Sequence, residues 1–199
     1  TKKQEQVFTE ADRNASNPVL WFGESQMTGN KIFLLSDLET KKLDSIKITG
    51  NVFIIEKDTL SSDGFQQIKG GLLDGAFENG KLDNIVITKN TEMVYYLYND
   101  EDLQLIGIDK TTCSALKMNF VEGQIDDITF LVSPIGDVYP EDEIPLNDRT
   151  LKGFIWRIKE RPETVEDLFD KNDEADQFPE ILKFQFPEES EKKESEKKS

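Results

Sequence analysis

The chain has 199 residues, of which 36% are hydrophobic and 32% charged, and its formal net charge is −16. This length suits one domain of ordinary size or a short array of repeats, and the polar composition indicates that part of the chain does not pack into a core. The acidic balance excludes nucleic-acid binding through the overall field of the protein and gives no attraction to an anionic membrane surface.

Residue types that are rare or missing exclude several kinds of chemistry. The chain has no histidine, which removes histidine-based nucleophile pairs, a histidine general base and every histidine-ligated metal site. The single cysteine, Cys113, excludes an intramolecular disulfide and is interpreted as a small core residue. No stretch approaches roughly 18 apolar residues, so we do not expect the chain to span a membrane. The sequence begins at Thr1 without a signal-like apolar run, which we interpret as a processed form or an expressed part of a longer sequence.

Residues 1–16 are polar and carry no period, whereas residues 17–140 show the alternation of β-strands. Apolar side chains recur at every second position, as in Leu116, Met118 and Phe120. Turn sequences such as ENGK and VEGQ punctuate these runs. The pattern predicts antiparallel strands of roughly five to eight residues joined by tight turns, and therefore an all-β fold.

A seven-residue phrase occurs three times: KLDSIKI at 42–48, KLDNIVI at 81–87 and QIDDITF at 124–130. Each follows a turn sequence and an apolar strand, so each is predicted to be the second strand of a hairpin. The second residues of the phrases, Leu43, Leu82 and Ile125, are 39 and 43 positions apart. We therefore expect three repeats of about forty residues and about four strands each, within a domain at 17–160.

One such unit cannot bury its apolar face alone, but stacked copies can form a continuous core. The paired apolar residues of the phrases would then line one inner face in register. The aspartate of each phrase (Asp44, Asp83 and Asp126) is predicted to accept local backbone N–H bonds.

The character of the chain changes after Pro140. An acidic loop precedes FIWRI at 154–158, which is predicted to be a closing strand. Residues 161–187 are expected to hold a short helix beginning at PETVEDLF and an extended strap, FPEILKFQFP. Residues 188–199 repeat ESEKK and are expected to be a disordered acidic tail.

Two local patterns have competing interpretations. DKNDEAD at 170–176 resembles the start of a calcium loop, but it has Ala175 where the turn needs Gly and Ile181 where a bidentate Glu should close the site, so we expect neither a metal nor a cofactor. The crowded tyrosines Tyr95, Tyr96 and Tyr98 fit core packing and edge cover, and they also fit an apolar groove suited to acyl chains. The groove interpretation gives ten candidate lining residues: Ile46, Ile48, Ile85, Ile87, Tyr96, Leu116, Met118, Phe120, Ile128 and Phe130.

Six segments in order carry a resemblance to a known family: NPVLWFGESQMTGNKI, QIKG, ENGKLDNIVI, VYYLY, LIGIDKTTCSALKMNFVEGQIDDITF and LKGFIWRIKERP. Together they resemble the C-terminal half of OstA-like proteins (organic solvent tolerance protein A-like), the LptA-type family of outer-membrane biogenesis in Gram-negative bacteria. The resemblance covers roughly residues 17–170 and rests on the order and spacing of the segments. Family members are usually longer, with more repeats upstream, so a fragment of a longer protein is one interpretation of this chain.

The resemblance implies a half-open, twisted β-jellyroll of stacked antiparallel strands. It also implies a non-enzymatic periplasmic carrier or bridge for lipopolysaccharide, associated with the outer membrane. Acyl chains of lipid A would lie in the apolar interior, and copies or other transport proteins would join through exposed edge strands. Lipid A phosphates are anionic, as is this protein, so the lipid would be held by its chains with Lys or Arg at the rim only.

Two other functions stay open. A closed version of the same stack, with a filled core and no lipid, would serve as an envelope scaffold or interaction module. An enzyme such as a carboxylate-dependent hydrolase would need two carboxylates roughly 5–10 Å apart in a cleft. An apolar groove in the structure would favour the lipid carrier. A filled core would favour the scaffold, and a cleft with two paired carboxylates would favour the enzyme.

Overall fold

The computed structural model describes residues 3–9 and 17–164 of the chain. Residues Thr1–Ile158 form one compact unit and Lys159–Ser199 a second, of which only the first six residues are described. The elements are β1 (Lys3–Thr9), β2 (Val19–Phe22), β3 (Ser25–Thr28), β4 (Lys31–Asp37), β5 (Leu43–Lys57), β6 (Phe65–Glu78), β7 (Lys81–Tyr98), β8 (Leu105–Val121), β9 (Gln124–Val132), β10 (Ile135–Tyr139) and the short 3₁₀ turns η2 (Leu146–Asp148) and η3 (Ile158–Glu160).

The ten strands form one open antiparallel sheet, which confirms the predicted all-β class. The main path of paired strands is β1-β4-β5-β6-β7-β8-β10. Strand β9 also pairs with β8, and the β2-β3 hairpin joins the sheet through β5. Sequential strands pair through local connections, as expected for a chain read as stacked hairpins.

The central strands are longer than the sequence pattern predicted. Strands β5 to β8 have 14 to 18 residues each, so the prediction of four short strands per repeat is wrong. Bulges lie inside two of these long strands: Gly50 and Asn51 in β5 have φ of 70° and 52°, and Lys89 and Asn90 in β7 have 70° and 56°. The register shifts at both places, while pairing continues on either side. A bulge bends a strand without ending it, which turns two expected strands into one.

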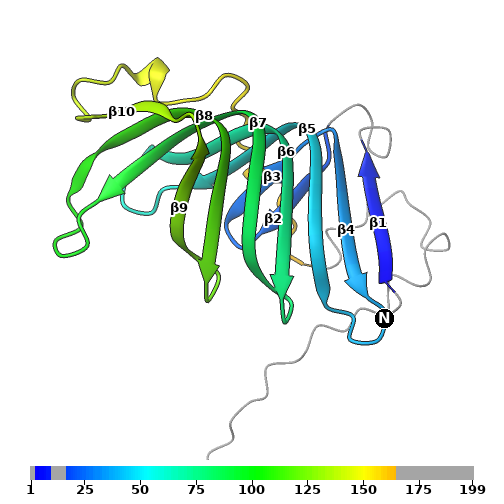
Figure 1. Ribbon diagram of the computed structural model, residues 1–199. Coiled ribbons are helices and arrows are strands. Elements are labelled where there is room, and N and C mark those ends of the chain that lie inside the picture. Colours follow the sequence, from blue (N-terminus) through cyan, green and yellow to red (C-terminus); the bar gives the residue numbers. More distant parts are fainter. Residues whose placement is uncertain (1–2, 10–16, 165–199) are drawn as a thin grey trace, which may run out of the picture. The chain divides into compact units, whose positions relative to one another are not determined.

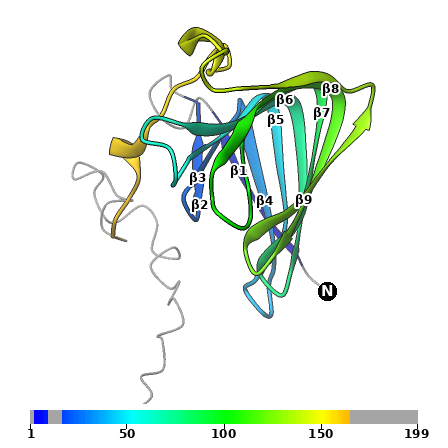
Figure 2. The same ribbon diagram turned by 90° about the vertical axis from the view of Figure 1, so that its left-hand side faces the viewer.

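The bulges divide the sheet into two limbs, and Figures 1 and 2 show the long strands bending over between them. The hairpin limb contains β1, β4, β9 and the strand halves that end in the tight hairpins, at residues 43–49, 72–78, 81–88 and 115–121. The covered limb contains β2, β3, β10 and the other strand halves, at residues 52–57, 65–70, 91–98 and 105–113.

The repeated phrases begin β5, β7 and β9, each as the second strand of a hairpin, as predicted. Two of these hairpins close through two-residue turns with positive φ at both positions, at Asn79-Gly80 and Glu122-Gly123. This geometry matches the twist of the flanking strands. The turn residues therefore set the register of the phrases.

The register brings the apolar residues of the phrases together on one face, as predicted. One row across the sheet consists of Ile48, Leu73, Ile87, Leu116 and Phe130. The next row consists of Ile46, Gly75, Ile85, Met118 and Ile128. Glycine is needed in the second row, because a Cβ at Gly75 would lie 2.7 Å from Cγ2 of Ile46.

These rows pack against the inner face of the covered limb. The resulting inner cluster consists of Met27, Ile32, Ile46, Ile48, Val52, Ile54, Ile68, Leu73, Leu82, Ile85, Ile87, Met93, Cys113, Leu116 and Met118. Val52, Ile54, Ile68 and Met93 come from the covered limb, so residues on both sides of the bulges bury one another. Each fully buried aliphatic side chain contributes about 1.5–3 kcal/mol, which makes this cluster the main source of stability.

The outer face of the covered limb is buried by the segment after β10. This outer cluster consists of Phe53, Ile55, Val94, Tyr96, Ile108, Ile144 and Leu151, with Phe65, Tyr98, Leu105, Tyr139, Phe154 and Trp156 packed against it. Residues 154–157 have no regular secondary structure, so the prediction of a closing strand at FIWRI is wrong. The segment at 140–157, which we call the cover, lies over the sheet face through side chains instead of joining the sheet through backbone ladders.

Two buried glutamines hold the cover in place. The Gln67 amide donates to the Arg149 carbonyl (2.8 Å) and accepts from the Leu151 N–H (2.9 Å). The Gln26 amide donates to the Ile155 carbonyl (2.9 Å) and accepts from the Arg157 N–H (2.7 Å). Both glutamines are almost fully buried, so their amides supply the cover backbone with the partners that a neighbouring strand would otherwise give.

Two of the three phrase aspartates contact side chains in place of the predicted backbone N–H groups. Asp44 forms an ion pair with Lys3 (2.7 Å), and Asp83 accepts a bond from the Asn84 amide (2.7 Å). Local backbone capping is made instead by Asp37, whose carboxylate accepts the N–H groups of Glu39 and Thr40. The turn chemistry was therefore assigned to the wrong aspartate of the first hairpin.

Several predictions lie outside the described residues. These are most of the polar segment at 1–16, whose residues 3–9 form β1, most of the helix expected from 162 onward, the calcium-loop-like stretch at 170–176, the extended strap to 187 and the low-complexity tail at 188–199. In the described part of the chain, no helix is long and apolar enough to cross a membrane.

Candidate functional site

The structure places nine of the ten candidate groove residues on the inner side of the hairpin limb. Six are buried in the inner cluster: Ile46, Ile48, Ile85, Ile87, Leu116 and Met118. Three are partly buried and pack against that cluster: Phe120, Ile128 and Phe130. These three partly buried candidates lie on β8 and β9.

Tyr96 lies on the opposite face from the other nine candidates. It belongs to the outer cluster, with Ile108 and Leu151, beneath the cover. Side chains alternate along a strand, so its neighbour Tyr95 faces the inner side and packs against the inner cluster. The expectation that one tyrosine ring faces each side is confirmed, and both Tyr95 and Tyr96 border the pocket described next.

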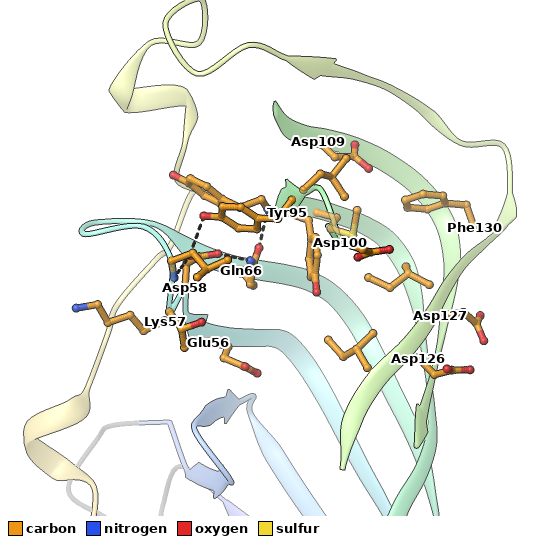
Figure 3. Close-up of a pocket in the computed structure, with 18 residues that line it drawn as sticks. Glu56, Lys57, Asp58, Gln66, Tyr95, Asp100, Asp109, Asp126, Asp127 and Phe130 are labelled. Atoms are coloured by element: carbon orange, nitrogen blue, oxygen red, sulfur yellow. Dashed lines mark hydrogen bonds between the residues drawn. The ribbon is translucent and has the colours of Figure 1, made fainter. Parts of the chain in front are cut away.

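A pocket of about 620 Å³ lies between the inner face of the covered limb and β9. Its apolar and aromatic lining comes from the loop after β5, from β7 and from β9: Leu60, Met93, Tyr95, Tyr96, Leu97, Tyr98, Ile125, Ile128 and Phe130. Figure 3 shows Tyr95 on one side of this space and Phe130 on the other. The volume lies within the range of roughly 300–1,000 Å³ that is usual for small-molecule sites.

The pocket is continuous with the inner cluster at one end and acidic at the other. Met93 belongs to the inner cluster, and Ile128 and Phe130 pack against it. Along β5, Val52 and Ile54 face inward. The next inward-facing position of the strand is Glu56, which lines the pocket. The inner face of the covered limb therefore changes from apolar to acidic with distance from the bend.

Sequence reasoning missed these acidic positions, although the alternation in VFIIEK contained the signal. Six carboxylates line the pocket: Glu56, Asp58, Asp100, Asp109, Asp126 and Asp127. They come from two strands of the covered limb, two loops and β9, so no single sequence motif contains them.

Asp58 is the most strongly fixed of these carboxylates. Its oxygens accept bonds from the N–H groups of Leu60 (2.8 Å) and Ser61 (2.6 Å), from the Gln66 amide (2.7 Å) and from the Tyr98 hydroxyl (2.8 Å). This network ties the loop after β5 to β6 and β7. Four donors fix the position of this carboxylate beside the pocket.

Burial and the nearby carboxylates raise the pKa values of two tyrosines at the pocket. Burial, the hydrogen bond to Asp58 and the charge of that carboxylate raise the pKa of Tyr98. Burial, with smaller effects of the Glu56 and Asp58 charges, raises the pKa of Tyr95. Both phenols therefore stay neutral at any physiological pH.

Other pocket acids bond to neighbouring polar side chains. Asp109 accepts from the Thr111 hydroxyl (2.5 Å), and Glu56 accepts from the Ser25 hydroxyl. Bonds from Asn119 and Thr129 lower the pKa of Asp127, which suits a fixed anion better than a proton donor. The described salt bridges involve Asp44, Asp74, Glu92, Glu122, Glu141 and Asp148, and none of the six pocket acids.

A second pocket of about 540 Å³ lies on the outer face of the hairpin limb. Phe33, Leu35 and Val86 contribute its apolar part, and Lys47 and Asp74, which form an ion pair (3.1 Å), contribute its polar part. This pocket does not touch the acidic loops and shares only Ile46 with the candidate list.

The described part of the chain contains neither a cluster of metal-ligating side chains nor a reactive cysteine. No group of three or more metal-ligating side chains is found among residues 3–9 and 17–164. Cys113 is buried in the inner cluster, and this burial raises the pKa of its thiol. A buried thiol with a raised pKa is unreactive, in keeping with its interpretation as a core residue.

The two sides of the sheet end in strands with exposed apolar residues. Strand β9 exposes Leu131 (49%) and Val132 (48%), and β10 exposes Ile135 (77%) and Val138 (49%). At the other side, β1 exposes Val7 and Phe8. The described sheet path ends at β1 and β10, with β9 beside β10 on β8, so these strands present unpaired backbone groups for another strand.

Comparisons with known proteins give no match. A scan against protein-family models finds none that matches the chain, and searches of curated proteins and of solved structures return no match. The likeness to OstA-like proteins therefore rests on the six sequence segments, and the function has to be argued from the pocket and the edges of the sheet.

Proposed function

We propose that this protein is a non-enzymatic lipid-binding protein that takes acyl chains of lipopolysaccharide into the space between its two limbs. The observation that carries this proposal is the pocket of about 620 Å³, whose apolar residues continue into the inner cluster. Each methylene of an acyl chain that leaves water there gains about 0.8 kcal/mol. The sequence resemblance adds the substrate class and the periplasmic, outer-membrane-associated location.

The edges of the sheet support the second part of the proposal, which is assembly through strand pairing. Strand β9 carries exposed Leu131 and Val132 beside unpaired backbone groups. A partner strand would gain main-chain hydrogen bonds and cover these side chains. The partner is a second copy of the chain or another lipopolysaccharide-transport protein.

A scaffold without lipid is the second candidate, and one observation favours it. Ile48, Leu73, Ile87 and Leu116 are 0% exposed, so the middle of the space between the limbs is filled by side chains. Lipid that enters beyond the pocket must displace these residues. The carrier and the scaffold therefore differ in whether acyl chains reach the pocket residues at all.

Photo-crosslinking separates the two candidates. Purified protein is irradiated with lipopolysaccharide that carries a photoreactive acyl chain, and the adducts are mapped by mass spectrometry. The carrier predicts adducts at Tyr95, Ile128 and Phe130. No adduct at the pocket, while a known lipid-binding protein crosslinks in parallel, supports the scaffold.

A matched pair of substitutions adds a control. Ile128→Trp fills part of the pocket, whereas Leu146→Trp adds the same bulk at an exposed position in η2. The carrier predicts that Ile128→Trp reduces crosslinking and Leu146→Trp leaves it unchanged. Equal crosslinking in both variants places the lipid elsewhere and removes the argument from the pocket.

Assembly is tested by sedimentation velocity over a range of protein concentrations. We expect the parent chain to form concentration-dependent oligomers and Leu131→Lys with Val132→Lys to stay monomeric, because charges on an edge strand oppose pairing. A monomer at every concentration would leave another protein as the only partner for this edge.

A further inference from the structure

The pocket combines an apolar floor with a mostly acidic rim. Met93, Leu97 and Phe130 contribute to the floor. The rim carries six carboxylates and one cationic residue, Lys57. In Figure 3 the Lys57 ammonium extends away from the labelled acidic side chains, so it does not neutralise them.

The order of residues along the strands fixes where a ligand's two ends would lie. On β5 the inward positions run from Val52 and Ile54 near the bend to Glu56 near the strand end. On β8 they run from Cys113 near the bend to Asp109. An amphiphile that buries its chain toward the inner cluster therefore has its head group among carboxylates.

Hydrogen bonds hold some of these carboxylates in place. Asp58 has four hydrogen-bond donors, and Asp127 has two side-chain donors. None of the six takes part in a described salt bridge. Among the described residues, no cation therefore forms a salt bridge with these acids, and Lys117 acts on Asp127 only through its charge.

We propose that the pocket selects amphiphiles whose head group carries an amine or another cationic group, and that it rejects amphiphiles with a purely anionic head. The inference rests on the proposed lipid binding and narrows its ligand class. Opposite charges attract more strongly at a partly buried site than in bulk water, and like charges there repel in the same measure. Applied to a lipopolysaccharide, the rule favours molecules whose head region bears amine substituents over those with bare phosphates.

The test compares three amphiphiles that share a dodecyl chain: dodecyltrimethylammonium, dodecyl maltoside and dodecyl phosphate. Each is titrated into the full chain below its critical micelle concentration, at neutral pH and physiological ionic strength, with heat as the readout. We expect affinity to fall from the cationic to the neutral to the anionic head. Between the first and the last we expect at least about a ten-fold difference in dissociation constant.

A matched pair of double variants separates the pocket from the overall charge of the protein, which by itself attracts cations. Glu56→Gln with Asp109→Asn removes two negative charges from the pocket. Asp142→Asn with Glu143→Gln removes two exposed charges from the cover, outside the pocket. We expect the Glu56→Gln/Asp109→Asn variant to reduce the affinity ratio between the cationic and the anionic amphiphile by about ten-fold. We expect the Asp142→Asn/Glu143→Gln variant to leave this ratio unchanged.

Each alternative outcome contradicts a different statement. If none of the three amphiphiles binds and the photoreactive lipopolysaccharide forms no adduct at the pocket, the proposed lipid binding fails. If all three bind with equal affinity, lipid binding stands and the selection by head group is wrong. If both double variants lose the preference equally, the selection belongs to the net charge of the chain and not to the pocket.

Discussion

The hairpin limb and the covered limb solve the same physical problem in different ways. Each is a sheet that must bury at least one face. The hairpin limb buries its inner face against the covered limb, and its outer face carries ion pairs such as Lys47–Asp74 and Lys81–Glu122. The covered limb buries both faces, one against the hairpin limb and one beneath the cover at 140–157.

The difference shows which part of the sheet is built by repetition and which by long-range contacts. The three phrases supply the hairpin limb with matching rows of apolar residues through local hairpins. The cover is attached to strands that lie 82 and 131 positions away in the sequence, through Gln67 and Gln26. We therefore expect the limbs to respond differently to substitution.

The largest effect is expected in the inner rows, which both limbs share. Ile87→Ala removes three carbons from a side chain that is 0% exposed, and we expect the free energy of unfolding to fall by about 2–5 kcal/mol. Urea denaturation measures the change. Val121→Ala, at an exposed position of the same limb, is the control and should change stability by less than about 0.5 kcal/mol. A loss below about 1 kcal/mol at Ile87 would mean that the inner rows are not tightly packed.

The next effect tests whether the cover is essential to the covered limb. Gln67→Leu removes three hydrogen bonds, one to the Phe65 carbonyl and two to the cover, and leaves the Arg149 carbonyl and the Leu151 N–H without their partner. We expect the free energy of unfolding to fall by about 2–4 kcal/mol, because buried polar groups that lose their partner carry the full cost of desolvation. Hydrogen exchange at Leu151 should accelerate at the same time.

The control for this substitution is Gln104→Leu, at an exposed position in the loop before β8. It makes the same chemical change where no described side-chain bond to the cover exists. If Gln67→Leu and Gln104→Leu have the same effect, the cover is held by apolar packing alone. The two buried amides would then serve only to satisfy the backbone.

The same contrast explains how much of the structure was predictable. The rows of the hairpin limb followed from the sequence because alternation, hairpin turns and the repeated phrase all point to one register. The bulges did not, because Gly50-Asn51 and Lys89-Asn90 have the composition of turns and their role depends on the neighbouring strand. The cover did not either, because FIWRI has strand composition and its packing is set by distant glutamines. For the pocket, Ile128 and Phe130 were predicted, and the acidic rim was missed because it is assembled from separate strands and loops.

The bend between the limbs can be tested at a glycine. A Cβ at Gly70 would lie 2.5 Å from Cγ2 of Ile87 and 3.2 Å from the carbonyl oxygen of Thr88. We expect Gly70→Ala to lower the free energy of unfolding by about 1–3 kcal/mol, the usual cost of overpacking. Ser114→Ala, at an exposed position of β8 opposite the β7 bulge, is the control and should be nearly neutral. An equally small effect at Gly70 would show that the bend opens easily to accept a methyl group.

The smallest effect is expected at the loop that borders the pocket. Tyr98→Phe removes the hydroxyl that donates to Asp58 (2.8 Å), and we expect the free energy of unfolding to fall by about 1–2 kcal/mol at neutral pH.

The pKa of Tyr98 is raised above its ordinary value of 10.0, chiefly by burial and by the bond to Asp58. A group whose pKa is raised in the folded state stabilises the fold below its unfolded pKa, and this stabilisation disappears as the pH rises through the folded pKa. The parent chain should therefore lose stability above a pH of about 10, and Tyr98→Phe should lose less over the same interval. Denaturation curves at several alkaline pH values measure both slopes. Parallel slopes would mean that the phenol titrates as it does in the unfolded chain, which would also remove one of the contacts that fix Asp58 at the acidic rim of the pocket.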